Sequence, residues 1–450
     1  MPSPSTVFAQ GNPQPLKWLL IKEWRELWTA RAWWLMLAVS GPVVGLSFIN
    51  AVQLYAEASG FNGTSEGVGE AFSPLVGVWA PTFSSYALLA TFIFPFVVIR
   101  LVGGDRQSGA LKLELQQGIP PIARMGAKAL VLLAGWMVTM VPVALALALW
   151  KSYGGSIYEP EVATVLIGHV LNAGLTVALG SAAAALSDHP STAAIITLSV
   201  TVGTWVVSFL AALHGGVWDR IAAFTPPALV AQFQHGLIRL DVTFAALTLA
   251  ALGLVISAIW IRLGVPTRRR AGETAAALAV AGVAVAACTL LRPSWDMAEN
   301  RQNSFSRSDE AALAAIARPL HIEAHFAAED ARRTELERMA LSKLRRVMPH
   351  LTVQYVARTS VGLFEQNTEH YGEIIYTLGG KQATSRIVSA DGVLETIYEL
   401  AGVTPPDVGG EAVFRGHPLA VPPRHAGTVF YGVWLAVVTA GAFVRYRRMA

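Results

Sequence analysis

Hydrophobic residues along this chain are gathered into long runs, and polar residues fill the segments between them. Eight runs approach the roughly 20 residues that cross about 30 Å of hydrocarbon as a helix. We therefore predict eight membrane-spanning helices, over residues 32–51, 82–99, 129–150, 162–186, 193–213, 242–263, 275–291 and 428–444. Pro95 and Pro142 fall inside two of these runs. We expect both to kink their helices, because proline removes a backbone hydrogen bond.

Lysine and arginine are unevenly divided between the connecting segments, and this division predicts the orientation of the spans. Cytoplasmic loops of membrane proteins retain positive charge. The short connections on one side carry only Lys151, Arg220 and Arg239. The other side carries many more basic residues, namely Lys17, Lys22, Arg25, Arg31, Arg100, Arg106, Lys112, Arg124, Lys128, Arg262, Arg268, Arg269, Arg270, Arg445, Arg447 and Arg448. Both termini are therefore expected in the cytoplasm.

The segment between the last two spans differs in composition from the rest of the chain. The stretch from Arg292 to Arg424 is less than a third of the chain, yet it contains half of all the Lys, Arg, Asp and Glu residues. Its patterns predict strands at 321–326, 351–356 and 374–378, an amphipathic helix over 329–348 and a helix over 391–400. The expected fold is therefore a mainly α-helical polytopic membrane protein with an inserted extracytoplasmic α/β domain between its last two helices.

Charge and cysteine content remove several classes of function. The net charge of +4 would suggest nucleic acid in a soluble protein, but here loops facing the cytoplasm account for it, so no nucleic-acid partner is expected. Cys288 is the single cysteine, which excludes an intramolecular disulfide and a cysteine-based zinc cluster.

Two short motifs that could bind a nucleotide or a metal are incomplete. Gly380 and Lys381 are followed by Gln382, without the Ser or Thr of an ATP-binding P-loop. His321 and His325 lack further clustered ligands, which favours a solvated strand face over a metal site.

The segment before the first span has the pattern of an interfacial helix. Its apolar face carries Leu20, Ile21, Trp24, Leu27 and Trp28, and the opposite side carries Lys22, Glu23, Arg25 and Glu26. A helix of this kind lies along the membrane surface, with its tryptophan rings among the headgroups. Two interpretations stay open. The helix is a simple juxtamembrane anchor, or it is an elbow helix, with Trp24, Arg25 and Trp28, that flanks a transport dimer.

The loop after the second span combines charge, a glycine break, spaced leucines and a proline stop. These features predict a compact helical knob presented to a cytosolic partner. The order Asp105, Arg106, Gly109, Leu111, Leu115, Pro120, Arg124 and Lys128 resembles the coupling loop of type-2 ABC exporter permeases. Asp105 stands here for the usual Glu, and Ala110 for the usual Thr. The resemblance extends over residues 17–264.

A second resemblance begins after the sixth span. Residues 294–306, with 371–373 and 379–381, are similar to the auxiliary extracytoplasmic domain of gliding-motility-type ABC systems. The two resemblances imply five parts: a cytoplasmic N-terminus with an elbow helix (1–31), a six-helix permease core (32–264), a basic linker with the seventh helix (265–291), an extracytoplasmic α/β domain (292–424), and the eighth helix with a basic tail (425–450).

The resemblance also implies a function. The chain would be the permease subunit of an exporter in a bacterial inner membrane, acting as a homodimer in the lipid bilayer. It would be no enzyme and would hold no cofactor, since ATP and magnesium would bind to a separate cytosolic ABC ATPase. The alternative is ATPase-driven mechanotransmission, or an assembly scaffold, in which residues 292–424 act on a periplasmic partner and nothing crosses the membrane.

Three polar residues fall at membrane depth: Asn50, His169 and Asn172. Polar groups inside a membrane often mark a substrate pathway. Hydrogen bonding between helices explains single His and Asn residues equally well. Both interpretations stay open. No arrangement typical of a hydrolase accompanies them, which disfavours a polytopic membrane enzyme.

Overall fold

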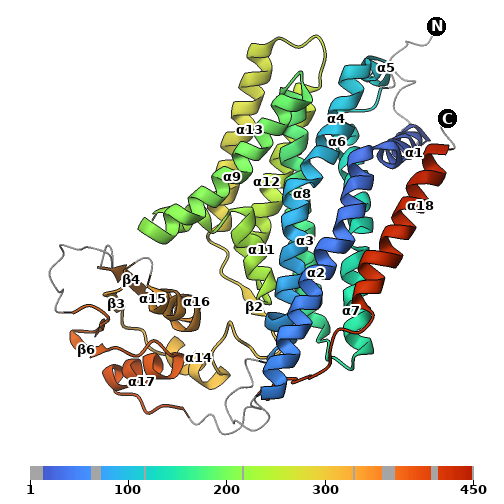
Figure 1. Ribbon diagram of the computed structural model, residues 1–450. Coiled ribbons are helices and arrows are strands. Elements are labelled where there is room, and N and C mark those ends of the chain that lie inside the picture. Colours follow the sequence, from blue (N-terminus) through green and yellow to red (C-terminus); the bar gives the residue numbers. More distant parts are fainter. Residues whose placement is uncertain are drawn as a thin grey trace, which may run out of the picture.

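The computed structural model describes residues 14–61, 72–115, 118–214, 217–327, 330–356, 370–406 and 414–447. Long helices run alongside one another as a bundle, and a smaller unit of strands and short helices lies at one end of it (Figure 1). Within the described residues, eight helical segments are long and apolar enough to cross a membrane. The sequence prediction of eight spans is confirmed at this level.

The eight spans alternate in direction along the bundle. Their helices are α2 (Arg31–Phe61), η3 (Leu75–Trp79) with α3 (Ala80–Phe92) and α4 (Phe94–Ser108), α6 (Pro121–Thr139) with α7 (Val141–Ser152), α8 (Glu159–Leu186), α9 (Pro190–His214), α12 (Leu240–Trp260), α13 (Thr267–Cys288), and η5 (Thr428–Val433) with α18 (Trp434–Arg447). The second and third spans are interrupted at Ile93 and Met140, just before Pro95 and Pro142. Both prolines predicted to kink their helices thus follow directly on an interruption of the helix.

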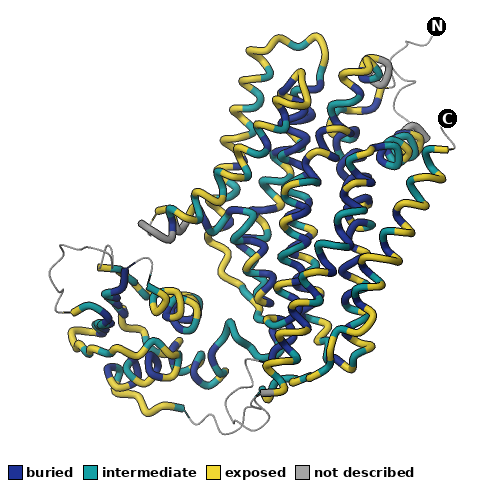
Figure 2. The backbone as a smooth tube through the Cα atoms, viewed as in Figure 1, coloured by how far each residue is buried: buried dark blue, intermediate teal, exposed yellow. Residues whose placement is uncertain are grey.

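Helix α8 lies at the centre of the bundle, where α4, α6, α9, α11 and α12 pack against it. Gly253 of α12 permits a close crossing, because a Cβ atom there would lie 2.8 Å from backbone atoms of Ala178. The outer helices are different. Along α9, α13 and α18, large apolar side chains such as Ile195, Val283 and Phe443 are 65%, 71% and 66% exposed. Figure 2 shows exposed positions along these outer helices. Such apolar surfaces suit contact with lipid tails.

Short elements occupy the two ends of the bundle. Helices α1 (Gln14–Thr29) and α5 (Ala110–Leu115) lie at the same end as the last turn of α18 and the connection between α12 and α13 (Figure 1). Helices α10 (Val217–Ala222) and α11 (Pro226–Gln234), followed by β1 (Leu237–Arg239), connect the fifth and sixth spans. The described basic residues of the sequence prediction thus gather at one end of the bundle. The side of a membrane that this end faces stays a prediction.

The smaller unit, residues 294–401, is called the sheet unit below. It begins with β2 (Ser294–Asp296) and contains a four-stranded sheet in the order β4-β3-β5-β6, where β3 is parallel to β4 and antiparallel to β5. The strands are β3 (Leu320–Ala324), β4 (Leu351–Tyr355), β5 (Ile374–Leu378) and β6 (Lys381–Ser385). The helices are α14 (Arg307–Ala314), α15 (Ala331–Leu336), η4 (Glu337–Leu341), α16 (Ser342–Val347) and α17 (Ala390–Ala401).

One face of this sheet forms a hydrophobic core with the helices. Alternate residues of β3 and β5, including Ile322 and Tyr376, are fully buried, together with Leu341, Leu344 and Ile397 of the helices. The predicted strands over 321–326, 351–356 and 374–378 and the predicted helix over 391–400 are confirmed, with small differences at their ends. Strand β6 and the pairing of β1 with β2 were not predicted.

Candidate functional site

Five charged side chains from three helices meet at the end of the bundle that carries the basic connections. We call this group the charged cluster. Its members are Lys22, Glu23 and Glu26 of α1, Asp105 of α4 and Lys128 of α6. The Nζ atom of Lys128 donates to Glu23 Oε2 at 2.7 Å and to Asp105 Oδ2 at 2.6 Å. The Nζ atom of Lys22 donates to Asp105 Oδ1 at 2.8 Å and lies 3.0 Å from Glu26 Oε1.

Three members of the charged cluster are withdrawn from solvent. Glu23, Lys128 and Asp105 are 0%, 1% and 4% exposed. Burial raises the pKa of Glu23, and the neighbouring Lys128 and Lys22 oppose that rise. A buried charge is stable only when an opposite charge and hydrogen bonds replace its water, and removal of one partner costs about 3–5 kcal/mol. The cluster therefore holds α1, α4 and α6 in one arrangement.

The buried side of α1 explains how its charges reach the interior. Leu19, Glu23 and Leu27 follow one another at four-residue spacing and are all buried, since positions i, i+4 and i+8 share a helix face. Leu27 lies directly over Gly135 of α6, where an added Cβ would be 2.3 Å from the Leu27 Cδ2 atom. The Nε1 atom of Trp33 donates to the Gly135 carbonyl at 3.2 Å. The first contact packs α1 against α6, and the second joins the start of α2 to the same point of α6.

This arrangement corrects the sequence prediction for the N-terminal helix. Glu23 was expected on its water-facing side, but it lies on the face that packs against α4 and α6. Its partner Lys128 is 105 residues away in the sequence, so helical periodicity alone could not reveal the pair. The sequence does contain one signal of the burial of Glu23, which is its position between Leu19 and Leu27 on the same apolar helix face.

Trp24 and Trp28 of α1 lie outside the charged cluster and contact other aromatic rings. Trp24 and Trp28 are half-buried, and their ring centroids lie 6.1 Å apart in an edge-on arrangement. Trp28 also contacts the rings of Trp33 and Trp34 at the start of α2, at 4.8 and 5.4 Å. Arg25 is exposed. The predicted elbow residues therefore form an aromatic corner between α1 and α2, with one cation on its outer side.

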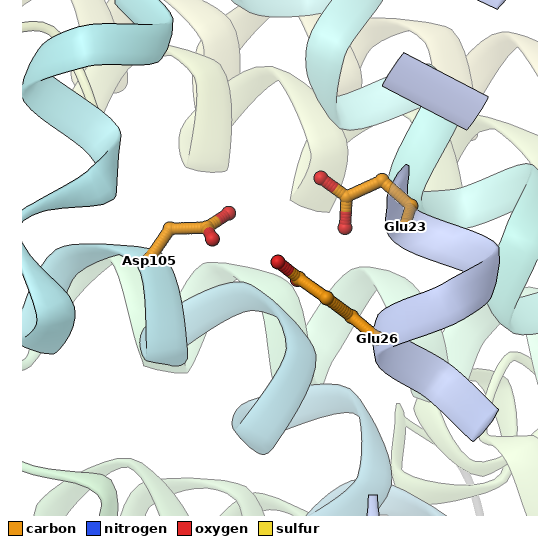
Figure 3. Close-up of side chains that lie close together, drawn as sticks. All are labelled: Glu23, Glu26 and Asp105. Atoms are coloured by element: carbon orange, nitrogen blue, oxygen red, sulfur yellow. The ribbon is translucent and has the colours of Figure 1, made fainter. Parts of the chain in front are cut away.

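Three carboxylates of the cluster face one another, as Figure 3 shows for Glu23, Glu26 and Asp105. Each offers an oxygen atom, and these atoms lie within 4.8 Å of one another, which resembles the donor set of a cation site. The ammonium groups of Lys22 and Lys128, however, already contact all three carboxylates. The geometry is that of an internal ion-pair network, and we assign it no metal.

The remaining residues of the predicted coupling loop lie around the end of α4. Arg106 donates to the Ala185 carbonyl at 2.9 Å and pairs with Asp188 at 2.8 Å, which ties α4 to the turn between α8 and α9. Gly109 ends α4 with a φ of 77°, a left-handed conformation that favours glycine. Leu111 on α5 is buried within the chain. The side chain of Leu115 lies outside the described residues.

The start of α6 carries the last three residues of that loop. Pro120 immediately precedes α6, a position at which its missing N–H costs nothing. Arg124 and Lys128 follow at four-residue spacing, and both are buried. Arg124 is fully buried, so its side chain is not on the surface that this loop presents; its role in coupling stays a prediction. Among the described side chains of α5, the exposed charge is Lys112.

The candidate pathway residues divide into two places. His169 and Asn172 are buried on α8, and the His169 ring lies against Phe83 and 3.4 Å from the amide nitrogen of Gln234 on α11. Asn50 is exposed on α2. The structure thus brings together His169 and Asn172 but leaves Asn50 apart. Their role in a pathway stays a prediction.

The sheet unit is joined to the bundle by contacts that the sequence did not predict. Strand β1 pairs with β2 in antiparallel register, and the Met297 amide donates to the Gly236 carbonyl at 2.8 Å. The Glu299 amide donates to the buried carboxylate of Glu161, at the start of α8, at 2.6 Å. The Glu299 carboxylate lies 3.0 Å from His417 Nε2. The sheet unit is therefore attached to the start of the fourth span and to the segment that precedes the sixth.

Comparisons with known proteins add no family to this picture. No protein-family model, curated protein or solved structure matches the chain. The charged cluster and the arrangement of the spans therefore carry the functional proposal.

Proposed function

We propose that the chain is the permease subunit of an exporter-type ABC transporter, driven by a separate cytosolic ATPase. In this proposal two copies form the transport unit in a bacterial inner membrane. The end with α1 and α5 faces the cytoplasm, and residues 292–424 form an extracytoplasmic α/β domain.

The charged cluster is the observation that carries the proposal. A force applied at the end of α4 would pass through Asp105 and Lys128 to α6, and through Glu23 to α1, because these buried groups are directly ion-paired. Helix α5 follows α4 directly and lies at the end of the bundle (Figure 1), and in this proposal it is the element on which a partner acts. If the ATPase held α5 in different positions in its different nucleotide states, the spans would also take different positions. Such a difference is what coupling between the ATP site and the transport path requires.

Permease-stimulated ATP hydrolysis tests this proposal. The full chain is purified from its native membrane, the P-loop ATPase that accompanies it is identified by mass spectrometry, and turnover is measured with and without the chain. Lys112→Glu and Leu115→Asp on α5 should each reduce the stimulation about tenfold, the equivalent of about 1.4 kcal/mol in docking. Arg269→Glu is the matched control, because Arg269 is exposed beside the other basic connection at the same end.

The proposal fails if no P-loop ATPase accompanies the chain, or if the α5 variants stimulate turnover as well as the wild-type chain does. Equal losses in the α5 variants and in Arg269→Glu would show a general effect of charge, and would also remove α5 as the docking element.

The junction between the sheet unit and the bundle favours one second function, ATPase-driven mechanotransmission. Glu161 is buried at the first turn of α8 and accepts a hydrogen bond from the sheet unit, so a movement of α8 would reach that unit directly. Under this alternative the ATPase measurements give the same result, but no solute crosses the membrane. A bundle closed along its axis in every nucleotide state would favour it over transport.

A further inference from the structure

A cleft opens at the end of the bundle beside α1, outside the charged cluster's buried core. It has a volume of about 300 Å³ and is lined by Trp18, Ile21, Lys22, Arg25, Glu26 and Thr29 of α1, and by Arg445 of α18. The first and the last helix of the described chain therefore form one cavity.

The cleft carries an excess of positive charge. Three of its lining residues are cationic and one, Glu26, is anionic. Lys22 is already engaged with Glu26 and Asp105. Arg25 is exposed and Arg445 is half-buried, so these two arginines supply the charge that a ligand would meet. Arginine presents several N–H groups in a planar fork, which matches the oxygen atoms of a phosphate.

An unsatisfied hydrogen-bond donor supports the same ligand chemistry. The Nε atom of the lining residue Arg445 is shielded from solvent and has no hydrogen-bond partner among the described residues. A buried donor without an acceptor is unfavourable. An acceptor-rich ligand would offset that cost at Arg445.

The position of the cleft indicates where the ligand comes from. Thr29 directly precedes Ala30 and the first span, and Arg445 lies in the last turn of the eighth span. The cleft is thus at the level where spans end and headgroups begin. Beside it, Leu16 and Trp18 of α1 are 42% and 64% exposed, as in helices that lie among lipid headgroups.

We propose that the cleft between α1 and α18 binds the phosphate headgroup of an anionic phospholipid, held by Arg25 and Arg445. The acyl chains would extend along an exposed apolar side of α18, where Val437 and Val444, seven residues apart and therefore on one helix face, are 60% and 49% exposed. This site is independent of any ATPase partner.

Lipid retention measured by native mass spectrometry tests the site. The delipidated full chain in detergent is offered phosphatidylglycerol or phosphatidylcholine. The wild-type chain should retain phosphatidylglycerol about tenfold more strongly, because basic residues near the headgroups attract anionic lipid. The double variant Arg25→Gln/Arg445→Gln should lose this preference. Lys17→Gln/Arg447→Gln should keep it, because Lys17 and Arg447 are exposed on the same two helices and do not line the cleft.

Each other outcome contradicts the proposal. An unchanged preference in Arg25→Gln/Arg445→Gln would remove the site, and an equal loss in both double variants would assign the preference to diffuse charge. Inorganic phosphate alone is offered in a parallel arm. If it raises the unfolding temperature in lipid-free detergent as much as phosphatidylglycerol does, the ligand is soluble phosphate and not a lipid. Arg25→Lys/Arg445→Lys, which conserves charge, should keep part of the preference and so controls for misfolding.

Discussion

Lys128 is the residue on which the charged cluster depends, because it is buried and lies 2.7 Å from Glu23 and 2.6 Å from Asp105. Lys22 contacts the same two carboxylates, but at 3.3 and 2.8 Å and with its side chain 33% exposed. Lys128 pairs with Glu23 from α1 and Asp105 from α4, and it also donates to the Leu101 carbonyl at 3.1 Å. These three oxygen acceptors take the place of the water molecules that would otherwise hydrate the Lys128 ammonium group. Glu26 occupies the rim of the same cluster, where its side chain is 38% exposed and water screens its charge.

Lys128→Met should lower the free energy of unfolding by about 3–5 kcal/mol, because it leaves two carboxylates buried without their main cation. Glu26→Gln, in the same cluster, should cost less than about 1 kcal/mol because Glu26 is solvated. Denaturant unfolding of the purified chain in detergent measures both. Equal losses in the two variants would mean that Lys128 is not the buried centre of the cluster.

A double-mutant cycle isolates the ion pair itself. Glu23→Gln combined with Lys128→Met should destabilise the chain by clearly less than the sum of the single changes, because Lys128→Met strands the buried Glu23 carboxylate and Glu23→Gln removes that charge. Strictly additive effects would show that Glu23 and Lys128 do not stabilise one another and would contradict the cluster.

The helices and strands that were predicted from the sequence are those whose pattern lies within a single stretch of neighbouring residues. The spans follow from the length of apolar runs, and β3 follows from the alternation of polar and apolar residues over 321–326. In the structure, buried and half-buried residues alternate along both β3 and β5. Strand β6 shows no such alternation because it is an edge strand with mostly exposed residues. Strand β1 is very short, and its partner β2 follows only after the sixth and seventh spans. Glu23 was misplaced for the same reason, since its burial depends on a distant cation.

The crossing of α8 and α12 gives a prediction about helix packing. Gly253→Val should lower the free energy of unfolding by about 1–3 kcal/mol, because the new side chain would meet the Ala178 backbone. Gly203→Val on α9 is the matched control, since a Cβ at Gly203 meets nothing within 4 Å. Denaturant unfolding in detergent should separate the two variants. Equal stability of the two variants would mean that α8 and α12 do not approach so closely.

Across the whole molecule, the bundle and the sheet unit form one connected structure with chemically different ends. The charged cluster and the cleft between α1 and α18 lie at one end, and the sheet unit lies at the other (Figure 1). The spans between them, above all α8, are in contact with both ends through Arg106 and Glu161. A movement that begins at α5 therefore has a continuous packed route to the sheet unit.

A disulfide cross-link tests whether the sheet unit is attached to the bundle by the pairing of β1 with β2. Ile238 and Trp295 are paired across β1 and β2, so cysteines at these positions in a Cys288→Ala background should form a disulfide under mild oxidation. The pair Ile238→Cys/Ser389→Cys, which the structure does not place in register, should remain reduced. The readout is mobility on a non-reducing gel. If both pairs react alike, the sheet unit is not docked through β1.

Thiol labelling of the two ends is the decisive measurement, because both functional proposals require α5 and the sheet unit to lie on opposite sides of a membrane. In the Cys288→Ala background, single cysteines replace Ser108, at the end of α4, and Ser389, before α17, both of which are exposed. A membrane-impermeant reagent applied to intact spheroplasts should label Ser389→Cys, and should label Ser108→Cys only after permeabilisation. Labelling of Ser108→Cys in intact spheroplasts, with or without Ser389→Cys, would contradict this orientation and both functional proposals with it.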